Sequence, residues 1–321
     1  MTRRRQRGVR IDGWLVIDKP EGTTSTEVVN VVKRLTKAEK AGHGGTLDPI
    51  ATGVLPVALG EATKTVQYVM EAPKRYRFTV RFGIATDTDD REGRVIAESD
   101  RRPTDEEIRA LLPRFVGEIG QLPPRYSAIK VAGERAYNLA RRGEEVELKP
   151  RRVVIHSFEL VGRPDPDHAV FEVVCGKGAY VRALARDLGE ALGCYGHIKS
   201  LRRLAVGPFT IEDAISLEAL EEIVRNETLP QVLIPVARAL AGIPALAVTE
   251  PQALRLRSGQ TVRISPALLP PEAREGDTLA VRRGDEVVAL ARLEDSLLRP
   301  VRVFRPKASR MPKGAIDVDY R

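Results

Sequence analysis

The carboxylate of Asp48 stands out within the stretch from Ala41 to Lys64, AGHGGTLDPIATGVLPVALGEATK. It is the single formally charged side chain between Lys40 and Glu61, although 30% of the whole chain is charged. Several glycines precede it, and a glycine backbone can adopt positive φ values or lie close to a ligand. A carboxylate among apolar residues is costly unless a cation pairs with it. The stretch therefore predicts a functional acid that is matched with a basic group from elsewhere in the chain.

A structural role for Asp48 fits the local pattern equally well. Asp-Pro often begins a helix, with Asp as the N-cap residue and Pro at the first helical position. The pattern alone leaves the two roles open. A phosphate-binding loop is excluded, because the Walker spacing is missing and Glu61-Ala62-Thr63-Lys64 has the wrong order for it.

Arg182 and Tyr76 are candidate partners for this acid. Arg182 lies in the first turn of the helix predicted after Tyr180, where a cation opposes the helix dipole unless an anion is near. It is either a surface residue or the cation that pairs with Asp48. Tyr76 begins an alternating strand in a chain with only 5% aromatic residues. It is either a core residue or a ring that can stack on a base.

Periodicity predicts the elements that must position these side chains. The segment from Arg75 to Gly83 alternates, so Tyr76 and Phe78 share one strand face with Val80 and Phe82. The sequence predicts capping boxes at Thr24–Glu27 and Thr104–Glu107, strands at Trp14–Ile17, Val153–Leu160 and Val170–Cys175, and a helix that ends at Gly193. From about Leu240 onwards, short strands and turns predict a compact β-rich module.

Composition narrows the class of protein. The chain has 321 residues, 42% of them hydrophobic, and no apolar run long enough to span a membrane, so we expect a globular protein. Its start, MTRRRQRGVR, lacks a secretory apolar core, which favours a cytoplasmic location. Cys175 and Cys194 are expected to be buried thiols, and the scattered histidines predict no metal site. The net charge of +8 favours a nucleic-acid partner, although a solvated basic surface is the alternative.

Five motifs, in the same order, resemble those of the TruB-type pseudouridine synthases. They are GHGGTLDPIATGVLPVALGEATK (42–64), KRYRF (74–78), PPRYSAIKVAGERAY (123–137), GKGAYVRALARDLG (176–189) and LRRLAVGPF (201–209). LRSGQ (256–260) and LRPVRVF (298–304) are similar to a PUA RNA-binding domain. The resemblance implies a catalytic domain over 10–238 with a basic RNA-binding excursion at 125–152, a PUA domain over 243–306, and basic tails at 1–9 and 307–321.

The fold that the resemblance implies is α/β (α+β), with a mixed, largely antiparallel sheet flanked by helices and loops. The resemblance also implies that Asp48 is the catalytic nucleophile, that Arg182 pairs with it, and that Tyr76 packs on the target base and assists proton removal from C5. Further matched positions are Tyr180 and Leu201 in the uridine pocket, His43 against the RNA loop, and Lys19 and Lys130 near the RNA path.

Pseudouridine formation breaks the N1–C1′ bond, turns the uracil and joins C5 to C1′. It involves no redox change and no group transfer, so we expect no cofactor and no metal. One carboxylate suffices, either by attacking the pyrimidine ring or by assisting departure from C1′, and the sequence leaves both routes open. The base must leave its stack, which costs a few kcal/mol and favours a replacement aromatic such as Tyr76.

The resemblance is to the stand-alone bacterial form, which implies action on the T-arm uridine of tRNA, at conventional position 55. We expect a monomer. Two alternatives are a guide-RNA-dependent synthase and a non-catalytic PUA-containing RNA chaperone. A third is an enzyme that releases the free base. A retaining glycosidase would need a second carboxylate about 5 Å away, and the motifs offer none.

Overall fold

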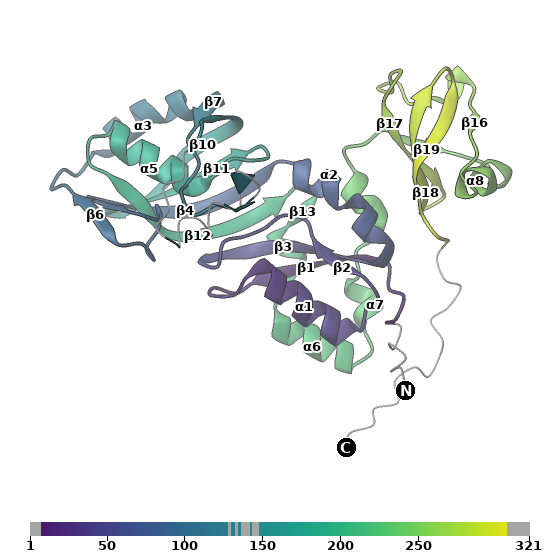
Figure 1. Ribbon diagram of the computed structural model, residues 1–321, viewed down its shortest axis with the longest axis horizontal. Coiled ribbons are helices and arrows are strands. Elements are labelled where there is room, and N and C mark those ends of the chain that lie inside the picture. The colour runs from purple at the N-terminus through teal and green to yellow at the C-terminus, as the bar shows by residue number, and fades with distance from the viewer. Residues whose placement is uncertain (1–7, 128–129, 132–133, 136–141, 143–147, 307–321) are drawn as a thin grey trace.

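A mixed β-sheet runs through most of the chain and carries helices on its faces (Figure 1). The computed structural model describes residues 8–127, 130–131, 134–135, 142 and 148–306. Within these ranges ten strands form the main sheet, in the order β14-β1-β3-β12-β4-β11-β10-β7, with β13 paired to β12 and β2 paired to β3. The pairs β1–β14 and β3–β12 are parallel and the others are antiparallel. The expected mixed, largely antiparallel sheet is confirmed.

The strands of the main sheet are β1 (Gly13–Lys19), β2 (Ala41–His43), β3 (Ala51–Leu59), β4 (Lys74–Phe82), β7 (Gly117–Gln121), β10 (Arg151–Asp165), β11 (His168–Cys175), β12 (Gly196–Val206), β13 (Phe209–Thr210) and β14 (Ala214–Ile215). Two short hairpins pair β5 (Ile84–Thr86) with β6 (Val95–Glu98), and β8 (Lys130–Val131) with β9 (Glu134–Arg135). The helices that accompany the sheet are α1 (Ser25–Thr36), α2 (Val66–Glu71), α3 (Asp105–Leu111), α5 (Val181–Ala191), α6 (Leu217–Arg225) and α7 (Leu229–Val232), with the 3₁₀ turns η1 (Gly60–Thr65), η2 (Leu112–Phe115), η3 (Ile211–Asp213) and η4 (Val236–Leu240).

Hydrophobic cores form where helices cover the sheet. Helices α1 and α6 lie side by side against β1 and β3, and their apolar faces meet Leu15 and Leu55 (Figure 1). At the other end, α5 and α3 cover β4, β11 and β10 over a cluster that includes Phe78 and Leu184. The site described below lies where these two halves of the sheet adjoin, at the neighbouring strands β3, β12 and β4.

The helix starts follow from local chemistry. Helix α1 begins with a capping box in which Thr24 and Glu27 satisfy each other's backbone N–H groups, and α3 begins in the same way with Thr104 and Glu107. Both starts confirm the sequence predictions. The two cysteines are free and buried, as expected.

The stretch around Asp48 contains more regular structure than its glycines indicated. Residues 51–59 form β3, which is almost entirely buried and pairs with β1 over residues 53–59. Pro56 lies within this strand, although proline cannot donate a hydrogen bond to a ladder. It is tolerated because the other neighbour of β3 changes there, from β12 at residues 51–53 to β2 at residues 57–59.

Gly53 is a position where glycine is required. Its φ is +98°, and a Cβ would lie 2.2 Å from the carbonyl oxygen of Arg203. We expect Gly53→Ala to lower the free energy of unfolding by clearly more than backbone strain alone, which is about 1–3 kcal/mol. Gly117→Ala is the matched control, since Gly117 has φ +96° but no atom within 4 Å of its Cβ position. Urea denaturation measures both, and equal losses would contradict the argument.

The C-terminal part is a β-rich module that contacts the rest of the chain. Its five-stranded sheet has the order β15-β17-β18-β19-β16. The elements are β15 (Ala245–Ala247), α8 (Glu250–Arg257), β16 (Val262–Arg263), η5 (Pro266–Leu268), β17 (Thr278–Arg283), β18 (Glu286–Glu294) and β19 (Leu297–Val303). Helix α8 was not anticipated among the predicted strands and turns. Phe304 packs in a cluster with Leu240 and Tyr68, and Lys64 of η1 donates to the carbonyl oxygen of Val303 at 2.7 Å.

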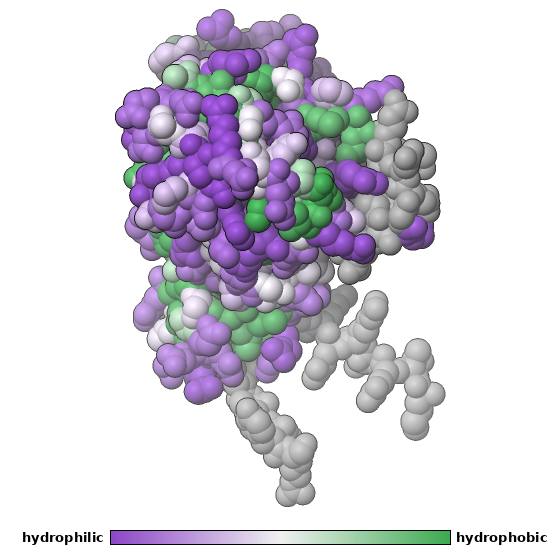
Figure 2. Space-filling view, turned by 90° about the vertical axis from the view of Figure 1, so that its left-hand side faces the viewer, coloured by the Kyte–Doolittle hydropathy of each residue, from purple (hydrophilic) through white to green (hydrophobic). Residues whose placement is uncertain are grey.

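The surface is largely polar at the end that carries α3 and α5. Figure 2 shows this end, where hydrophilic residues cover most of the face and hydrophobic residues appear as separate patches. In the described ranges, the helices lack the combination of length and apolarity needed to cross a bilayer.

Candidate active site

Asp48 lies in a turn between β2 and β3. Pro49 and Ile50 continue the turn, and the N–H of Ala51 donates to the carbonyl oxygen of Asp48 at 3.0 Å before β3 begins. No helix starts at this Asp-Pro pair, so the helix-capping interpretation of Asp48 is wrong.

Both neighbours of Asp48 are fixed from the β1–α1 segment. The N–H of Leu47 donates to Oγ of Ser25 at 2.8 Å, and the hydroxyl of Ser25 donates back to the carbonyl oxygen of Leu47 at 3.2 Å. On the other side, the carbonyl oxygen of Pro49 accepts from Nζ of Lys19 at 3.1 Å and from the N–H of Gly22 at 2.9 Å. The Asp48 side chain itself remains 38% exposed. The backbone is therefore held firmly while the carboxylate stays accessible.

Arg182 is the cation that meets this carboxylate. Its Nε lies 2.9 Å from Oδ2 of Asp48, and its side chain is only 5% exposed. Within the described residues this Nε has no partner with hydrogen-bond geometry, so the contact is an ion pair. Arg182 is thus not a surface residue, and the alternative that paired it with Asp48 is the one that the structure bears out.

A second carboxylate, Asp90, lies behind Arg182. Its Oδ2 is 3.7 Å from Nη1 of Arg182, and it is 7% exposed. The guanidinium also donates to the carbonyl oxygens of Thr88 at 3.1 Å and Tyr126 at 2.9 Å. Asp90 was not predicted from the sequence, because nothing in the local pattern relates residues 87–90 to a helix more than 90 positions later.

Two tyrosines border the ion pair. Tyr76 of β4 is half-buried and packs against the core cluster that contains Leu201. Burial raises the pKa of Tyr76, Arg203 partly opposes this shift, and the negative charge of Asp48 adds to it. Burial also raises the pKa of Tyr180, with a further contribution from Asp48. Both phenols therefore keep their protons at neutral pH, and both lie within the electrostatic reach of Asp48.

Leu201 is 7% exposed and pairs in register with Ala51 of β3 and Phe78 of β4. It therefore forms part of the apolar floor beside the ion pair. The structure thus brings together Asp48, Arg182, Tyr76, Tyr180 and Leu201, which the resemblance implied as parts of one site.

Arg203 organises the glycine-rich segment before Asp48. It is 1% exposed and donates to the carbonyl oxygens of Val54 at 2.7 Å, Gly45 at 3.0 Å and Thr46 at 3.3 Å. No role for Arg203 was predicted from the sequence. Alternation along residues 201–203 could have placed it on the same strand face as Leu201, had β12 been recognised as a strand.

His43 lies in β2, next to this segment. Its Nδ1 accepts the N–H of Gly45 at 3.4 Å. Burial lowers the pKa of His43 and the charge of Arg203 lowers it further, so the imidazole is neutral at pH 7. His43 is half-buried, which leaves part of the ring accessible.

Lys19 is fully buried, and Nζ donates to the carbonyl oxygens of Pro20, Thr23 and Pro49. This leaves no surface of Lys19 for the direct RNA contact that the resemblance implied. Its amino group instead fixes the turn that carries Asp48. Lys130 begins β8, and its side chain lies outside the described residues, so its RNA contact stays a prediction.

The pKa of Lys19 should depend on the charge of Asp48. Burial lowers the pKa of Lys19 from 10.5 to about 8, and Asp48 partly offsets this shift. We expect Asp48→Asn to lower this pKa further, because the stabilising negative charge is removed. The folded-state pKa of Lys19 lies below 10.5, so between about pH 8 and 10.5 the unfolded chain binds more protons than the folded protein, and the free energy of unfolding rises with pH. In the variant this rise should begin at a lower pH.

The measurement is an NMR titration of the Lys19 side chain. Asp18→Asn is the control, because Asp18 pairs with Arg202 and does not perturb Lys19. An unchanged Lys19 pKa in Asp48→Asn would show that the two groups are not coupled.

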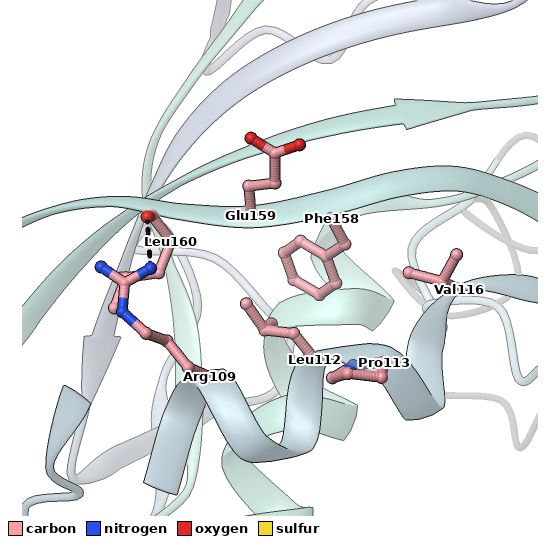
Figure 3. Close-up of a pocket in the computed structure, with 7 residues that line it drawn as sticks. All are labelled: Arg109, Leu112, Pro113, Val116, Phe158, Glu159 and Leu160. Carbon is pink, nitrogen blue, oxygen red and sulfur yellow. Dashed lines mark hydrogen bonds between the residues drawn. The ribbon is translucent and has the colours of Figure 1, made fainter. Parts of the chain in front are cut away.

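A cavity of about 660 Å³ lies elsewhere, between η2 and β10 (Figure 3). Phe158 and Leu112 point into it, whereas Glu159 points to the other side of the strand. Arg109 donates to the carbonyl oxygen of Leu160 at 3.3 Å. The cavity shares no lining residue with the Asp48–Arg182 pair, so we place the candidate site at the ion pair.

Comparison with known protein families gives two matches that adjoin. The model described as "TruB family pseudouridylate synthase (N terminal domain)" matches residues 33–181. The model described as "tRNA pseudouridylate synthase B C-terminal domain" matches residues 182–241.

Whole-length relatives agree with these matches. A tRNA pseudouridine synthase B from Gluconacetobacter diazotrophicus is 56% identical over 305 residues, which cover 94% of this chain and 100% of that protein. One from Ruegeria pomeroyi is 51% identical over 305 residues, covering 95% and 99%.

Two solved structures are also similar. The archaeal box H/ACA sRNP Nop10-Cbf5 complex contains a chain with a TM-score of 0.70 and 27% identity, covering 92% of this chain and 87% of that one. An H/ACA RNP bound to a substrate RNA containing 2′-deoxyuridine contains a chain with a TM-score of 0.72 and 25% identity, covering 92% and 86%.

Proposed function

This chain belongs to the TruB family of pseudouridylate synthases, which isomerise uridine in tRNA, and from that premise we propose that it converts uridine 55 of the tRNA T-arm to pseudouridine. The observation that carries the proposal is the ion pair between an accessible carboxylate, Asp48, and a buried guanidinium, Arg182. A nucleophile must be reachable by its substrate, and the fixed cation beside this carboxylate holds it in place.

In the proposed reaction Asp48 acts on an extruded uridine, either at the pyrimidine ring or by assisting departure from C1′. The N1–C1′ bond breaks, the uracil turns, and C5 joins C1′. The proton on C5 is lost and N1 gains one, so the reaction is an isomerisation and the carboxylate is regenerated. Tyr76, Tyr180 and Leu201 would enclose the base and replace the stacking lost on extrusion.

Proton removal from C5 requires a group that can accept the proton, and Tyr76 is the candidate. Its raised pKa means that the resting side chain is a phenol, which packs on a base but is a poor proton acceptor. To act as a base, Tyr76 must first release its own proton, and the positive charge of Arg203 lowers the cost of that step. We therefore assign Tyr76 first to packing, with Arg203 as the group that supports any basic role.

RNA binding is proposed to involve the C-terminal module as a PUA domain. Arg263 of β16 and Arg302 of β19 are exposed there, which suits contact with phosphates.

A purely RNA-binding chaperone would not need an accessible carboxylate beside a buried arginine, because a carboxylate weakens a phosphate-binding surface. Identities of 51% and 56% to tRNA pseudouridine synthases B, against 25% and 27% to chains of H/ACA complexes, favour an enzyme that acts without guide RNA.

The test is to incubate purified protein with an unmodified tRNA transcript, without cofactor or guide RNA, and to map carbon-linked uridine. We expect one modified position, in the T-arm. A transcript with cytidine at that position is the control and should remain unmodified. Release of free uracil would indicate a glycosylase, modification at another uridine would overturn the T-arm assignment, and no reaction without a guide RNA would overturn stand-alone action.

A further inference from the structure

Gln121, the last residue of β7, makes two hydrogen bonds to the backbone of Tyr180. The N–H of Tyr180 donates to Oε1 of Gln121 at 2.8 Å, and Nε2 of Gln121 donates to the carbonyl oxygen of Tyr180 at 3.1 Å. Gln121 is 1% exposed. A single side-chain amide thus pairs with both the backbone N–H and the carbonyl oxygen of Tyr180, as a neighbouring strand would. The two residues are 59 positions apart in the sequence.

Tyr180 is the N-cap residue of α5. Its backbone is extended, with φ −110° and ψ 116°, and no side chain caps the helix. Its carbonyl oxygen also accepts the N–H of Leu184 at 3.2 Å, which is the first bond of the helix. The N-cap conformation sets where a helix begins and which way its first turn faces. Arg182 lies two residues later. The amide of Gln121 therefore sets the rotational position of the first turn of α5, and this position directs the guanidinium towards Asp48.

The segment that follows Gln121 accepts hydrogen bonds from side chains of the same helix, α5. Nη2 of Arg186 donates to the carbonyl oxygen of Leu122 at 2.7 Å, and Nη2 of Arg182 donates to that of Tyr126 at 2.9 Å. Gln121 begins this run of contacts and is the one member that holds the backbone of α5 rather than one of its side chains. The position of the arginine therefore depends on it most directly.

We propose that Gln121 is a positioning residue for pseudouridine formation, acting through Tyr180 and Arg182; this inference rests on the function proposed above. Gln121 is buried behind the helix start and has no surface for RNA. Its loss should therefore slow the reaction of bound RNA without weakening RNA binding. A merely structural role, in which Gln121 only attaches β7 to α5, would lower stability without this selective effect.

The first experiment compares Gln121→Met with Thr36→Val. Met keeps the length of the side chain but removes both hydrogen bonds. Thr36→Val also removes two buried hydrogen bonds, from Oγ1 to the carbonyl oxygen of Val32 and from the N–H of Ala38 to Oγ1, far along the sequence from the site. We expect the single-turnover rate at saturating tRNA to fall by about 10-fold or more in Gln121→Met, as for other losses of positioning, with the Kd for tRNA changed less than about twofold. Thr36→Val should keep the rate of the unaltered protein.

The second experiment uses the pH profile of Gln121→Glu. A protonated carboxyl group can donate and accept like the amide, whereas a carboxylate can only accept. Burial raises the pKa of a carboxyl group, so the activity of this variant, relative to the unaltered protein, should recover as the pH falls. Gln121→Met should show no such recovery.

An activity-independent readout separates this inference from the proposed function. The NMR signal of Arg182 Nε–H should shift in Gln121→Met and remain unchanged in Thr36→Val. If the unaltered protein does not modify the T-arm, the proposed function fails, and the Arg182 signal still tests the placement by Gln121. An unshifted signal, an unchanged rate in Gln121→Met, or an equal rate loss in Thr36→Val would overturn the inference.

Discussion

Asp48→Asn is expected to lower the rate of pseudouridine formation by on the order of 10³-fold or more, as is found when a catalytic nucleophile is removed. Asparagine keeps the size of the side chain but carries no charge, so it can neither attack the pyrimidine nor assist at C1′ as an anion. The turn that carries residue 48 is held by Ser25 and Lys19 through the backbone of its neighbours, so it should keep its conformation. Single-turnover assays with a T-arm stem-loop measure the loss.

Binding of the same RNA should change by less than about threefold, because most of the affinity of an RNA-binding protein comes from phosphate contacts that Asp48 does not make. Asp18→Asn is the matched control, since Asp18 is similarly exposed and also pairs with an arginine, but its partner Arg202 is 39% exposed whereas Arg182 is 5% exposed. Substantial turnover by Asp48→Asn would remove Asp48 from the role of nucleophile.

Arg182→Met is expected to cost both activity and stability. The buried guanidinium faces two carboxylates and two carbonyl oxygens, and its removal leaves Asp90 buried without its cation. Breaking a buried ion pair in this way costs about 3–5 kcal/mol of unfolding free energy. The rate should fall by on the order of 10²-fold, the loss that accompanies removal of one fixed electrostatic contact.

Urea denaturation and single-turnover assays measure the two effects. Arg202→Met is the control, because the Arg202–Asp18 pair is 39% and 35% exposed and such pairs contribute about 0–1 kcal/mol. Arg182→Lys tests the same point if the Met variant does not fold, since it keeps the charge but cannot reach all four oxygens. Equal losses in Arg182→Met and Arg202→Met would show that the buried pair has no special role.

Local patterns predicted the elements that frame the site. Capping boxes at Thr24 and Thr104 gave the starts of α1 and α3, and alternation from Arg75 gave β4 with Tyr76 and Phe78 on one face. These signals are reliable because each depends on neighbours within one or two turns of the chain. The pairing of Asp48 with Arg182 came instead from the resemblance, and the residues alone left it open.

The supporting residues could not be predicted in this way. Asp90, Gln121 and Arg203 act through contacts with partners that are distant in the sequence, and no local periodicity encodes such contacts. Lys19 shows the opposite problem, because the resemblance implied a position near the RNA path, whereas the side chain is buried. In the structure three carbonyl oxygens and the nearby carboxylate of Asp48 compensate its burial.

The attachment of the C-terminal module has a consequence for substrate choice. Glu61 and Lys64 of η1 bind the chain at Arg305 and Val303, and η1 directly follows β3, which begins three residues after Asp48. The module and the reacting carboxylate are thereby tied to the two ends of one short, rigid piece of backbone. If RNA contacts both, as proposed above, the attachment sets the distance between the two contacts, so an RNA of the wrong dimensions should bind more weakly whatever its base sequence.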